Sequence, residues 1–440
     1  MVSISDPAEI PTIYGFNPIF QKSDFYHVLL FYAKGKPVPT IFATQNDNLH
    51  HALRKPISTI YGMSKVVSFE PQVNSTMEYF FKRLDDVFAD KDQVCNFAFW
   101  LQAFAFDVIG EVTFSKRIGF LKKGEDIDGI MGSIWKYFTA TSPVSQMPWL
   151  DLVWTKNPIK QRLSRAKPNP IVNFAAARVE ERQTRMKKAL SSNEVLEKRD
   201  FLSQFLEITQ RDEQIPPFAL AAWTVSNVTA GSDTTAILLR SIFYNLMRHP
   251  KSMRCLLDEL DAAARNGRLS QLVTWKESRG LPYLDACIKE AARLHPPFAL
   301  PFERVVPSGG ATICGRRFQA GTVVAIPAWV AHRDVDTFGK DPDEWRPERW
   351  LCEETRRRRM ENALLTFGAG HRVCLGKNVS YLEIYKLVPT MLRKYEISFA
   401  EPARPEWTVK NRWLAHQFNF NVKLRQRVVD QDQTPLDLYD

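Results

Sequence analysis

The stretch Phe367-Gly368-Ala369-Gly370-His371-Arg372-Val373-Cys374-Leu375-Gly376 stands just before a segment whose apolar spacing predicts a helix from Leu375 to about Tyr395. Three glycines within ten residues permit a tight backbone and the close approach of a flat ligand. Cys374 stands at the start of the predicted helix, where unpaired N–H groups and positive potential stabilise a thiolate. The stretch therefore predicts a thiolate site, although a lone cysteine beside a glycine-rich turn is more often a buried structural residue.

The spacing F-x-x-G-x-R-x-C-x-G is complete in this stretch, and it resembles the signature of the cytochrome P450 family. The resemblance implies haem b with Cys374 as the axial ligand of the iron. A thiolate bound opposite O2 donates electron density to the iron and favours O–O cleavage. The resemblance also assigns Arg372 to a haem propionate and Phe367 to shielding of the sulfur. Gly370 and Gly376 complete the expected cofactor contacts of this loop.

A second motif, Ala230-Gly231-Ser232-Asp233-Thr234-Thr235, lies inside an apolar segment that predicts one helix from Pro216-Pro217 to about Arg248. A glycine inside a helix costs about 1 kcal/mol relative to alanine, and a glycine with a threonine invites a local distortion. Small residues at a helix crossing would explain the motif equally well. Its place before Cys374 matches the distal helix of the family. The resemblance therefore implies catalytic roles: Thr234 hydrogen-bonds O2 and Asp233 supplies protons to it.

Charged residues further along the chain match a structural network of the family. Glu290-Ala291-Ala292-Arg293 puts a carboxylate and a guanidinium on one face of a predicted helix, and Arg349 lies in Pro347-Glu348-Arg349-Trp350. The i, i+3 pair alone says little, because exposed pairs contribute only about 0.3–0.5 kcal/mol. The resemblance implies that Glu290, Arg293 and Arg349 form a buried network behind the haem. Buried charges persist only when they are paired, so we expect a structural role.

Two further arginines are expected near the haem edge. Arg304 matches a family arginine that meets a propionate. His50 and Arg54 stand where the family often has W-x-x-x-R, again for a propionate, although His50 and the neighbouring His51 could equally be surface residues.

The composition excludes several classes of protein. The chain is 45% hydrophobic and 25% charged, which is typical of a folded globular protein. Six cysteines without a C-x-x-C pair argue against a disulfide framework and a structural zinc site. The net charge of +10 suits an acidic protein or an anionic membrane. The sequence contains no helix-turn-helix, zinc-finger or RNA-binding signature, so nucleic acid is not expected as a partner.

The distribution of apolar residues and glycines along the sequence predicts a mainly α fold with a small β portion (α+β). Together with the family resemblance, it predicts a single compact haem-binding domain over residues 1–440. Apolar residues at helical spacing predict helices at 69–88, 97–109, 169–190, 251–266 and 283–294. Short β-branched runs broken by glycine predict strands within 303–330, and residues 405–424 predict a hairpin. Residues 334–362, which include Arg356-Arg357-Arg358-Arg359, are expected to be loop.

The resemblance implies an apolar, aromatic pocket for a small-molecule substrate. The stretches expected to contact the substrate are 10–45, 222–231, 298–302 and 414–418, with Phe298, Leu300, Phe302 and Phe418 among them. Lys377 and the four arginines at 356–359 flank the thiolate loop. Their charge suits an acidic flavoprotein of the NADPH-cytochrome P450 reductase type, steered by electrostatics.

The family resemblance, especially to fungal secondary-metabolism enzymes, implies the cytosolic face of the endoplasmic reticulum. By comparison with such relatives, we expect the N-terminal anchor, hinge and first helix to be missing from the sequence given. No segment is expected to span a membrane, because the uncharged stretch from Phe218 to Ser232 is too short.

Three functions remain open at this point. The first is an O2-dependent monooxygenase that takes electrons from an NADPH-dependent reductase and acts on an apolar molecule of secondary metabolism. The second is a peroxide-driven or rearrangement enzyme, against which the pair Asp233 and Thr234 argues, since such enzymes need no proton relay. The third is a truncated relative that binds haem or a ligand without turnover.

Overall fold

The computed structural model describes residues 1–33, 36–154, 156–157, 159, 170–192, 200–403 and 406–428. The fold is mainly helical with small sheets, as predicted. Its α-helices are α1 Ile10–Tyr14, α2 Asp47–Arg54, α3 Met63–Val66, α4 Glu70–Val87, α5 Phe97–Phe114, α6 Phe120–Lys123, α7 Ile130–Val144, α8 Pro148–Trp154, α10 Pro170–Ser192, α11 Phe201–Arg211, α12 Ala219–Gly231, α13 Asp233–Arg248, α14 Pro250–Arg265, α15 Trp275–Ser278, α16 Pro282–Leu294, α17 Ala328–Ala331, α18 Val335–Phe338, α19 Glu354–Asn362 and α20 Lys377–Lys394.

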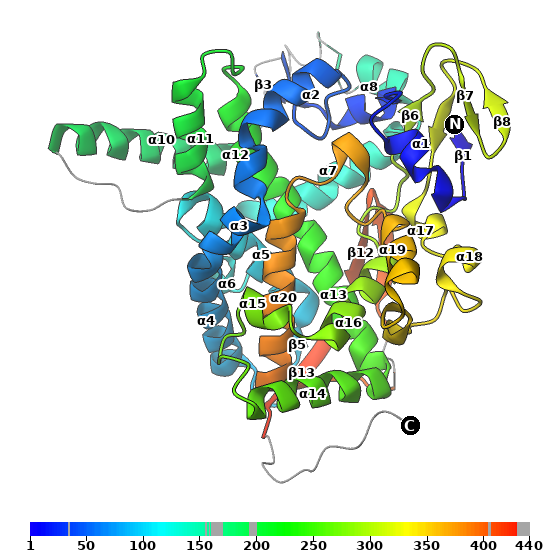
Figure 1. The fold of residues 1–440 in the computed structure, drawn as a ribbon. Coiled ribbons are helices and arrows are strands. Elements are labelled where there is room, and N and C mark those ends of the chain that lie inside the picture. Colours follow the sequence, from blue (N-terminus) through cyan, green and yellow to red (C-terminus); the bar gives the residue numbers. More distant parts are fainter. Residues whose placement is uncertain are drawn as a thin grey trace.

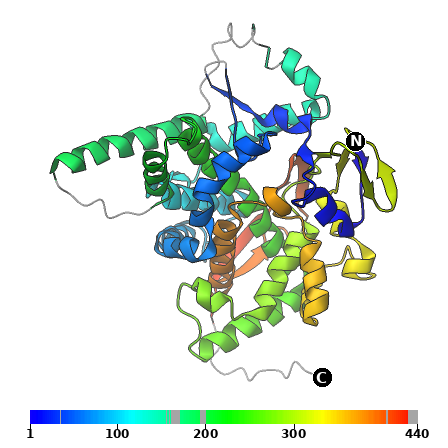
Figure 2. The ribbon, with the colours of Figure 1, turned by 45° about the horizontal axis from the view of Figure 1, so that its top comes forward.

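Short strands form several small sheets, and those that pair with the N-terminal segment lie at one side of the molecule. The strands are β1 Val2–Ser3, β2 Gln21–Lys22, β3 Phe31–Ala33, β4 Lys36–Val38, β5 Cys95–Asn96, β6 Arg304–Val305, β7 Ala311–Ile313, β8 Arg316–Phe318, β9 Val323–Ala325, β10 Tyr395–Phe399, β11 Thr408–Arg412, β12 Leu414–Phe418 and β13 Asn421–Gln426. The largest sheet has the order β1-β9-β6-β2 and joins the N-terminal segment to the strands predicted within 303–330. Figure 2 shows this side with the N-terminus beside the yellow hairpin of β7 and β8.

The centre of the molecule is a bundle in which α13 packs against α5, α16 and α20. Figure 1 shows α20 and α13 crossing the middle of the fold, with α14 below them. Helix α5 is buried almost all round, because it places phenylalanine, alanine and other apolar residues on every face. Prolines fix the helix starts: Pro250 begins α14 directly after α13 ends, and Pro282 begins α16.

The predicted single helix over 216–248 is interrupted, which corrects the sequence-based boundary. The segment forms α12 and α13, with Ser232 between them at φ −90° and ψ −62°. The Ser232 hydroxyl donates to Val228 O at 3.0 Å, and the Thr234 hydroxyl donates to Ala230 O at 2.8 Å. Such side-chain bonds to the preceding turn bend helices, so the motif itself causes the break.

The expectation of a loop at the four arginines was wrong. These residues lie in α19, where Glu353 caps the helix by accepting from Arg356 N at 3.3 Å. Glu354 pairs with Arg358 one turn later. Both charge types are good helix formers, so the run forms an exposed helix although it lacks apolar periodicity.

One helix, Phe97–Phe114, is long and apolar enough to cross a membrane by length and composition. However, 89% of its residues are buried inside the fold, where it packs against α4, α12 and α13. It is therefore a core helix of the domain, which the sequence-based search for spans did not single out.

Candidate active site

The loop before α20 folds back on itself and holds Cys374 at its end. Cys374 N donates to Phe367 O at 2.8 Å, which closes the loop. Gly368 and Gly370 adopt φ values of +68° and +63°, which glycine reaches at little cost. The ring of Phe367 packs edge-on against Tyr381 of α20 with centroids 4.9 Å apart. The loop is therefore fixed by its backbone and by the helix that follows it.

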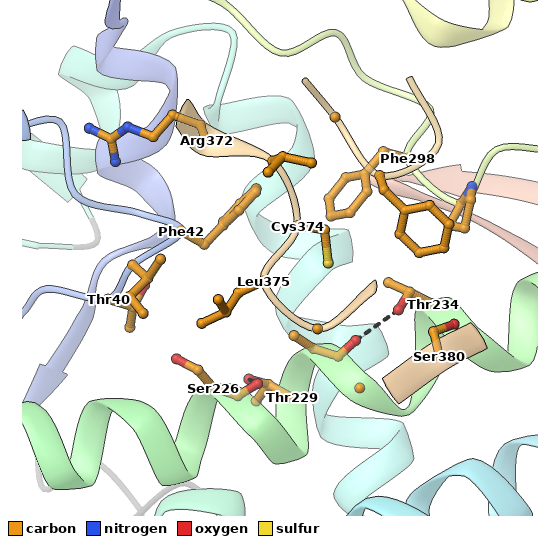
Figure 3. A pocket seen from close by; sticks show the side chains of 18 of the residues that line it. Thr40, Phe42, Ser226, Thr229, Thr234, Phe298, Arg372, Cys374, Leu375 and Ser380 are labelled. Carbon is orange, nitrogen blue, oxygen red and sulfur yellow. Dashed lines mark hydrogen bonds between the residues drawn. The ribbon is translucent and has the colours of Figure 1, made fainter. Parts of the chain in front are cut away.

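The Cys374 sulfur faces an internal cavity (Figure 3). Burial raises the pKa of this thiol, while the N–H groups of Gly376 and Lys377 and the charge of Arg54 lower it. Burial is the largest of these effects, so the protein atoms alone leave the thiol protonated at neutral pH. A bound metal cation deprotonates a coordinating thiol outright. A metal at this sulfur would therefore shift the thiol to its thiolate form.

Aromatic and aliphatic side chains form most of the cavity wall. Figure 3 shows Phe42 and Phe298 on either side of Cys374, with Ser226 and Thr229 of α12 and Thr234 of α13 facing the same space. Parts of all four predicted contact stretches line the cavity. The apolar lining includes Phe42, Tyr137, Phe138, Phe298, Phe302 and Leu414. Leu300 and Phe418 are not among the lining residues, and Phe418 instead packs against Trp135 at 5.1 Å.

The two residues expected to be catalytic point to different surroundings. Thr234 lines the cavity, as the motif predicts. Asp233 is buried and its side chain meets Gln102, which donates to it, and His416, whose Nε2 lies 3.6 Å from the carboxylate. Thr234 lines the cavity and Asp233 does not, because adjacent helix residues project about 100° apart and Asp233 faces Gln102 and His416 instead. A proton route from Asp233 would therefore need a side-chain rotation or an intervening water.

Basic side chains gather at one end of the cavity. Arg54 donates to Val373 O at 2.8 Å, and Arg372 pairs with Asp47. Three donors here are buried without a partner in the described part of the chain: Arg304 Nε, Arg372 Nε and His50 Nε2. Burial lowers the pKa of His50 to about 2, so its ring is neutral. The unpaired Nε donors of Arg304 and Arg372 fit the carboxylates of a porphyrin, and the apolar space beside Cys374 fits its ring.

Gly370 has a different role from the expected cofactor contact. It does not line the cavity, whereas Gly376 does. A Cβ at position 370 would lie 1.6 Å from Tyr14 O of α1. Gly370 therefore lets the N-terminal helix pack directly on the loop.

The predicted network of Glu290, Arg293 and Arg349 forms completely. One carboxylate oxygen accepts from Arg293 Nη2 at 2.8 Å and Arg349 Nε at 2.9 Å, and the other accepts from Arg293 Nε at 2.8 Å. Trp350 Nε1 also donates to it at 2.9 Å. All three charged side chains are fully buried. The network ties α16 to the segment after α18, behind the cavity.

Comparison with known proteins identifies the family. The model for cytochrome P450 matches residues 1–423. This chain belongs to the cytochrome P450 family. It is 51% identical to cytochrome P450 monooxygenase cicH of Emericella nidulans over 426 residues, covering 97% of this chain and 84% of the relative. A cytochrome P450 monooxygenase of Aspergillus terreus is 55% identical over 399 residues, covering 90% of this chain and 81% of the relative.

A third relative is larger than this chain. Cytochrome P450 monooxygenase mpaDE of Penicillium roqueforti is 44% identical over 97% of this chain, which covers 50% of that relative. The protein is thus a P450 monooxygenase, an oxidoreductase, and the family binds haem through a cysteine thiolate.

The sequence reading missed two buried groups that line the cavity of this P450. Glu383 of α20 is fully buried, and neither carboxylate oxygen has a partner in the described residues. Lys22 of β2 is also buried at the cavity wall. The sequence signal that could have revealed Glu383 is a glutamate placed between apolar positions of a predicted helix. No local pattern marked Lys22, because the register of a two-residue strand is set by partners far along the chain.

Proposed function

We propose that this P450 inserts one oxygen atom from O2 into an apolar small organic molecule of secondary metabolism. The observation that carries the proposal is the single cavity that brings together the Cys374 sulfur, the Thr234 hydroxyl and an aromatic wall. The relatives are named monooxygenases, which supports oxygen insertion as the type of reaction. The apolar lining supports the substrate class, since such pockets bind ligands largely through buried apolar surface.

Haem would be held by Cys374 at the iron and by Arg54, Arg304 and Arg372 at its carboxylates, and when bound it supplies the activation of O2. The chain's own residues position and protect the reaction. The Thr234 hydroxyl donates to Ala230 O at 2.8 Å, which places it at the cavity wall. Rotation of this hydroxyl would let it donate to a ligand in the cavity instead. Phe298 and Phe302 line the cavity, where their apolar rings disfavour water beside the substrate. Asp233 holds a proton-exchanging carboxylate one residue from Thr234.

Electrons are proposed to come from an NADPH-dependent flavoprotein of the P450 reductase type. The net charge of +10 and the exposed arginines of α19 support an acidic partner. Such charge complementarity accelerates association and makes it sensitive to salt.

Turnover with an isotopically labelled O2 atmosphere tests the proposal. The haem-loaded protein is mixed with a P450 reductase, NADPH and a panel of apolar aromatic compounds that shift its absorbance spectrum. We expect at least one product that gains a single labelled oxygen atom, with Thr234→Ala reducing product formed per NADPH consumed. Product that forms only with added peroxide and carries no labelled oxygen, or ligands that bind and never react, would contradict the proposal.

A further inference from the structure

Ser226 of α12 differs from the other hydroxyl residues around it. Four neighbouring hydroxyls each donate to the carbonyl oxygen four residues earlier, at 2.8–3.0 Å: those of Thr224, Thr229, Ser232 and Thr234. The Ser226 hydroxyl makes no such bond and has no other hydrogen-bond partner in the described residues. Ser226 lines the cavity, and Figure 3 shows its side chain facing that space. Its hydroxyl is therefore available to a molecule in the cavity.

The other hydroxyl and amide groups of the cavity wall are already engaged. Each of them that belongs to the described lining residues has a hydrogen-bond partner within the chain. Asn227, the residue next to Ser226, accepts from Tyr61 Oη at 2.5 Å and donates to Thr113 Oγ1 at 3.2 Å. Within this part of the wall, Ser226 is thus the hydroxyl whose hydrogen-bonding capacity the chain leaves unused.

A ligand that fills the cavity determines whether the Ser226 hydroxyl finds a partner. An apolar group beside it would displace water and leave the hydroxyl unsatisfied, which is unfavourable in an enclosed space. A hydroxyl or carbonyl oxygen at the same place would form a hydrogen bond with it, because a serine hydroxyl both donates and accepts. The surrounding wall is apolar, with Phe42 and Phe138 among its rings. It therefore suits an aromatic molecule that carries an oxygen substituent.

Ser226 lies away from the residue expected to meet O2. Thr234 follows it by about two helical turns, or roughly 12 Å along the axis of the α12–α13 segment. Both residues line the same cavity. A change at Ser226 therefore alters the binding of the ligand without removing the Thr234 hydroxyl.

We propose that Ser226 binds an oxygen substituent, a hydroxyl or a carbonyl, of an otherwise apolar aromatic substrate. This inference rests on the function proposed above, because it names the substrate class of that same cavity. Ser226 thereby determines the preference of the enzyme for oxygenated over purely hydrocarbon molecules. A site that hydrogen-bonds one group of its substrate discriminates against analogues that lack this group.

The binding of a matched pair of ligands tests the proposal. 2-Naphthol and 2-methylnaphthalene have nearly the same shape, and only 2-naphthol carries a hydroxyl. Their dissociation constants are measured by equilibrium dialysis with the haem-loaded protein in the absence of reductant. Ser226→Ala removes the available hydroxyl. The matched control is Thr229→Val, which removes a hydroxyl of the same helix that is already bonded to Val225 O.

We expect Ser226→Ala to weaken the binding of 2-naphthol relative to 2-methylnaphthalene by about threefold to tenfold, which is the effect of one neutral hydrogen bond. Thr229→Val should leave the ratio of the two dissociation constants at its wild-type value. An unchanged ratio in Ser226→Ala would mean that the Ser226 hydroxyl turns back to Ala222 O in the complex, and it would overturn the proposal. An equal change of the ratio in Thr229→Val would overturn it as well.

Haem content and the thermal unfolding temperature establish that the variants fold. If Ser226→Ala does not fold, Ser226→Cys takes its place, because a thiol has a similar size and forms weaker hydrogen bonds. Binding is measured without turnover. The absence of an oxidised product would therefore count against the proposed monooxygenase function and leave this inference intact.

Discussion

At the scale of single residues, Glu383 shows how the cavity controls protonation. Burial raises the pKa of Glu383 well above its usual range, and neither carboxylate oxygen has a hydrogen-bond partner in the described residues. The folded protein therefore favours protonated Glu383 at pH values where the unfolded chain ionises it. Between the unfolded and the folded pKa the native state binds more protons, so stability falls as pH rises.

Glu383→Gln removes this pH dependence, because glutamine has the shape of the protonated acid and does not ionise. We expect the variant to gain stability relative to wild type as pH increases from about 5 to 8, at about 1.4 kcal/mol per unit of pKa shift. Urea unfolding at both pH values measures the difference. If wild type loses no more stability than Glu383→Gln between these two pH values, then Glu383 ionises in the folded state and the prediction is wrong.

At the scale of the elements, the buried network decides how α16 is joined to the segment that contains Arg349. Glu290→Gln places an N–H2 group against the donors of Arg293 and Arg349. It leaves the buried Arg293 without a carboxylate partner in the described residues and Arg349 with only Asp341, at 3.4 Å. Removing one partner of a buried ion pair costs about 3–5 kcal/mol. We expect that loss in denaturant unfolding, together with lower haem content.

The matched control for this prediction is Glu354→Gln on α19. Glu354 pairs with Arg358 at the surface, where both side chains are more than half exposed. An exposed pair contributes about 1 kcal/mol or less. Similar losses for the two variants would mean that the network contributes no more than a surface pair.

Gly231, the last residue of α12, lies close to Ile109 of α5. A Cβ at Gly231 would lie 3.0 Å from Ile109 Cδ1 and Cγ1, so Gly231→Ala should cost about 1 kcal/mol or more despite the better helix propensity of alanine. Ile109→Ala removes both of these atoms. In a double-mutant cycle we expect Gly231→Ala to cost less in that background. If the stability losses of the two single variants simply add, the cost of Gly231→Ala does not arise from contact with Ile109.

Sequence reasoning succeeded for elements with strong local signals. Helix spacing and proline starts placed α4, α14 and α16 within one or two residues. It failed at Ser232, where side-chain bonds to the preceding turn interrupt an otherwise continuous apolar pattern. It also failed at α19, whose helix is stabilised by a cap and an ion pair rather than by apolar spacing.

At the scale of the whole molecule, the N-terminal segment packs on the thiolate loop. Strand β1 pairs in parallel with β9, and Tyr14 of α1 meets Gly370. These contacts join residues more than 300 positions apart, which no local pattern reveals. The motif residues around Cys374 could be predicted because their spacing is local, whereas the contacts of Lys22 and Asp233 depend on this long-range packing.

Gly370→Ala tests the packing of α1 on the loop. The substitution combines a φ of +63° with a Cβ that would overlap Tyr14 O. We expect a loss of more than about 2 kcal/mol in unfolding experiments. Gly267→Ala is the control, since Gly267 has a φ of +66° and open space around it. It should cost only about 1 kcal/mol. Equal costs for the two variants would show that α1 does not press on the loop.

The central claim, that the sulfur of residue 374 binds haem iron, is tested most directly by the absorbance spectrum of the reduced protein with carbon monoxide. Wild type and Cys352→Ala should both show the red-shifted Soret band of a thiolate-bound haem, and Cys374→Ala should lack it. A Cys374→Ala protein with the same band as wild type, or a folded wild-type chain that takes up no haem, would contradict the account.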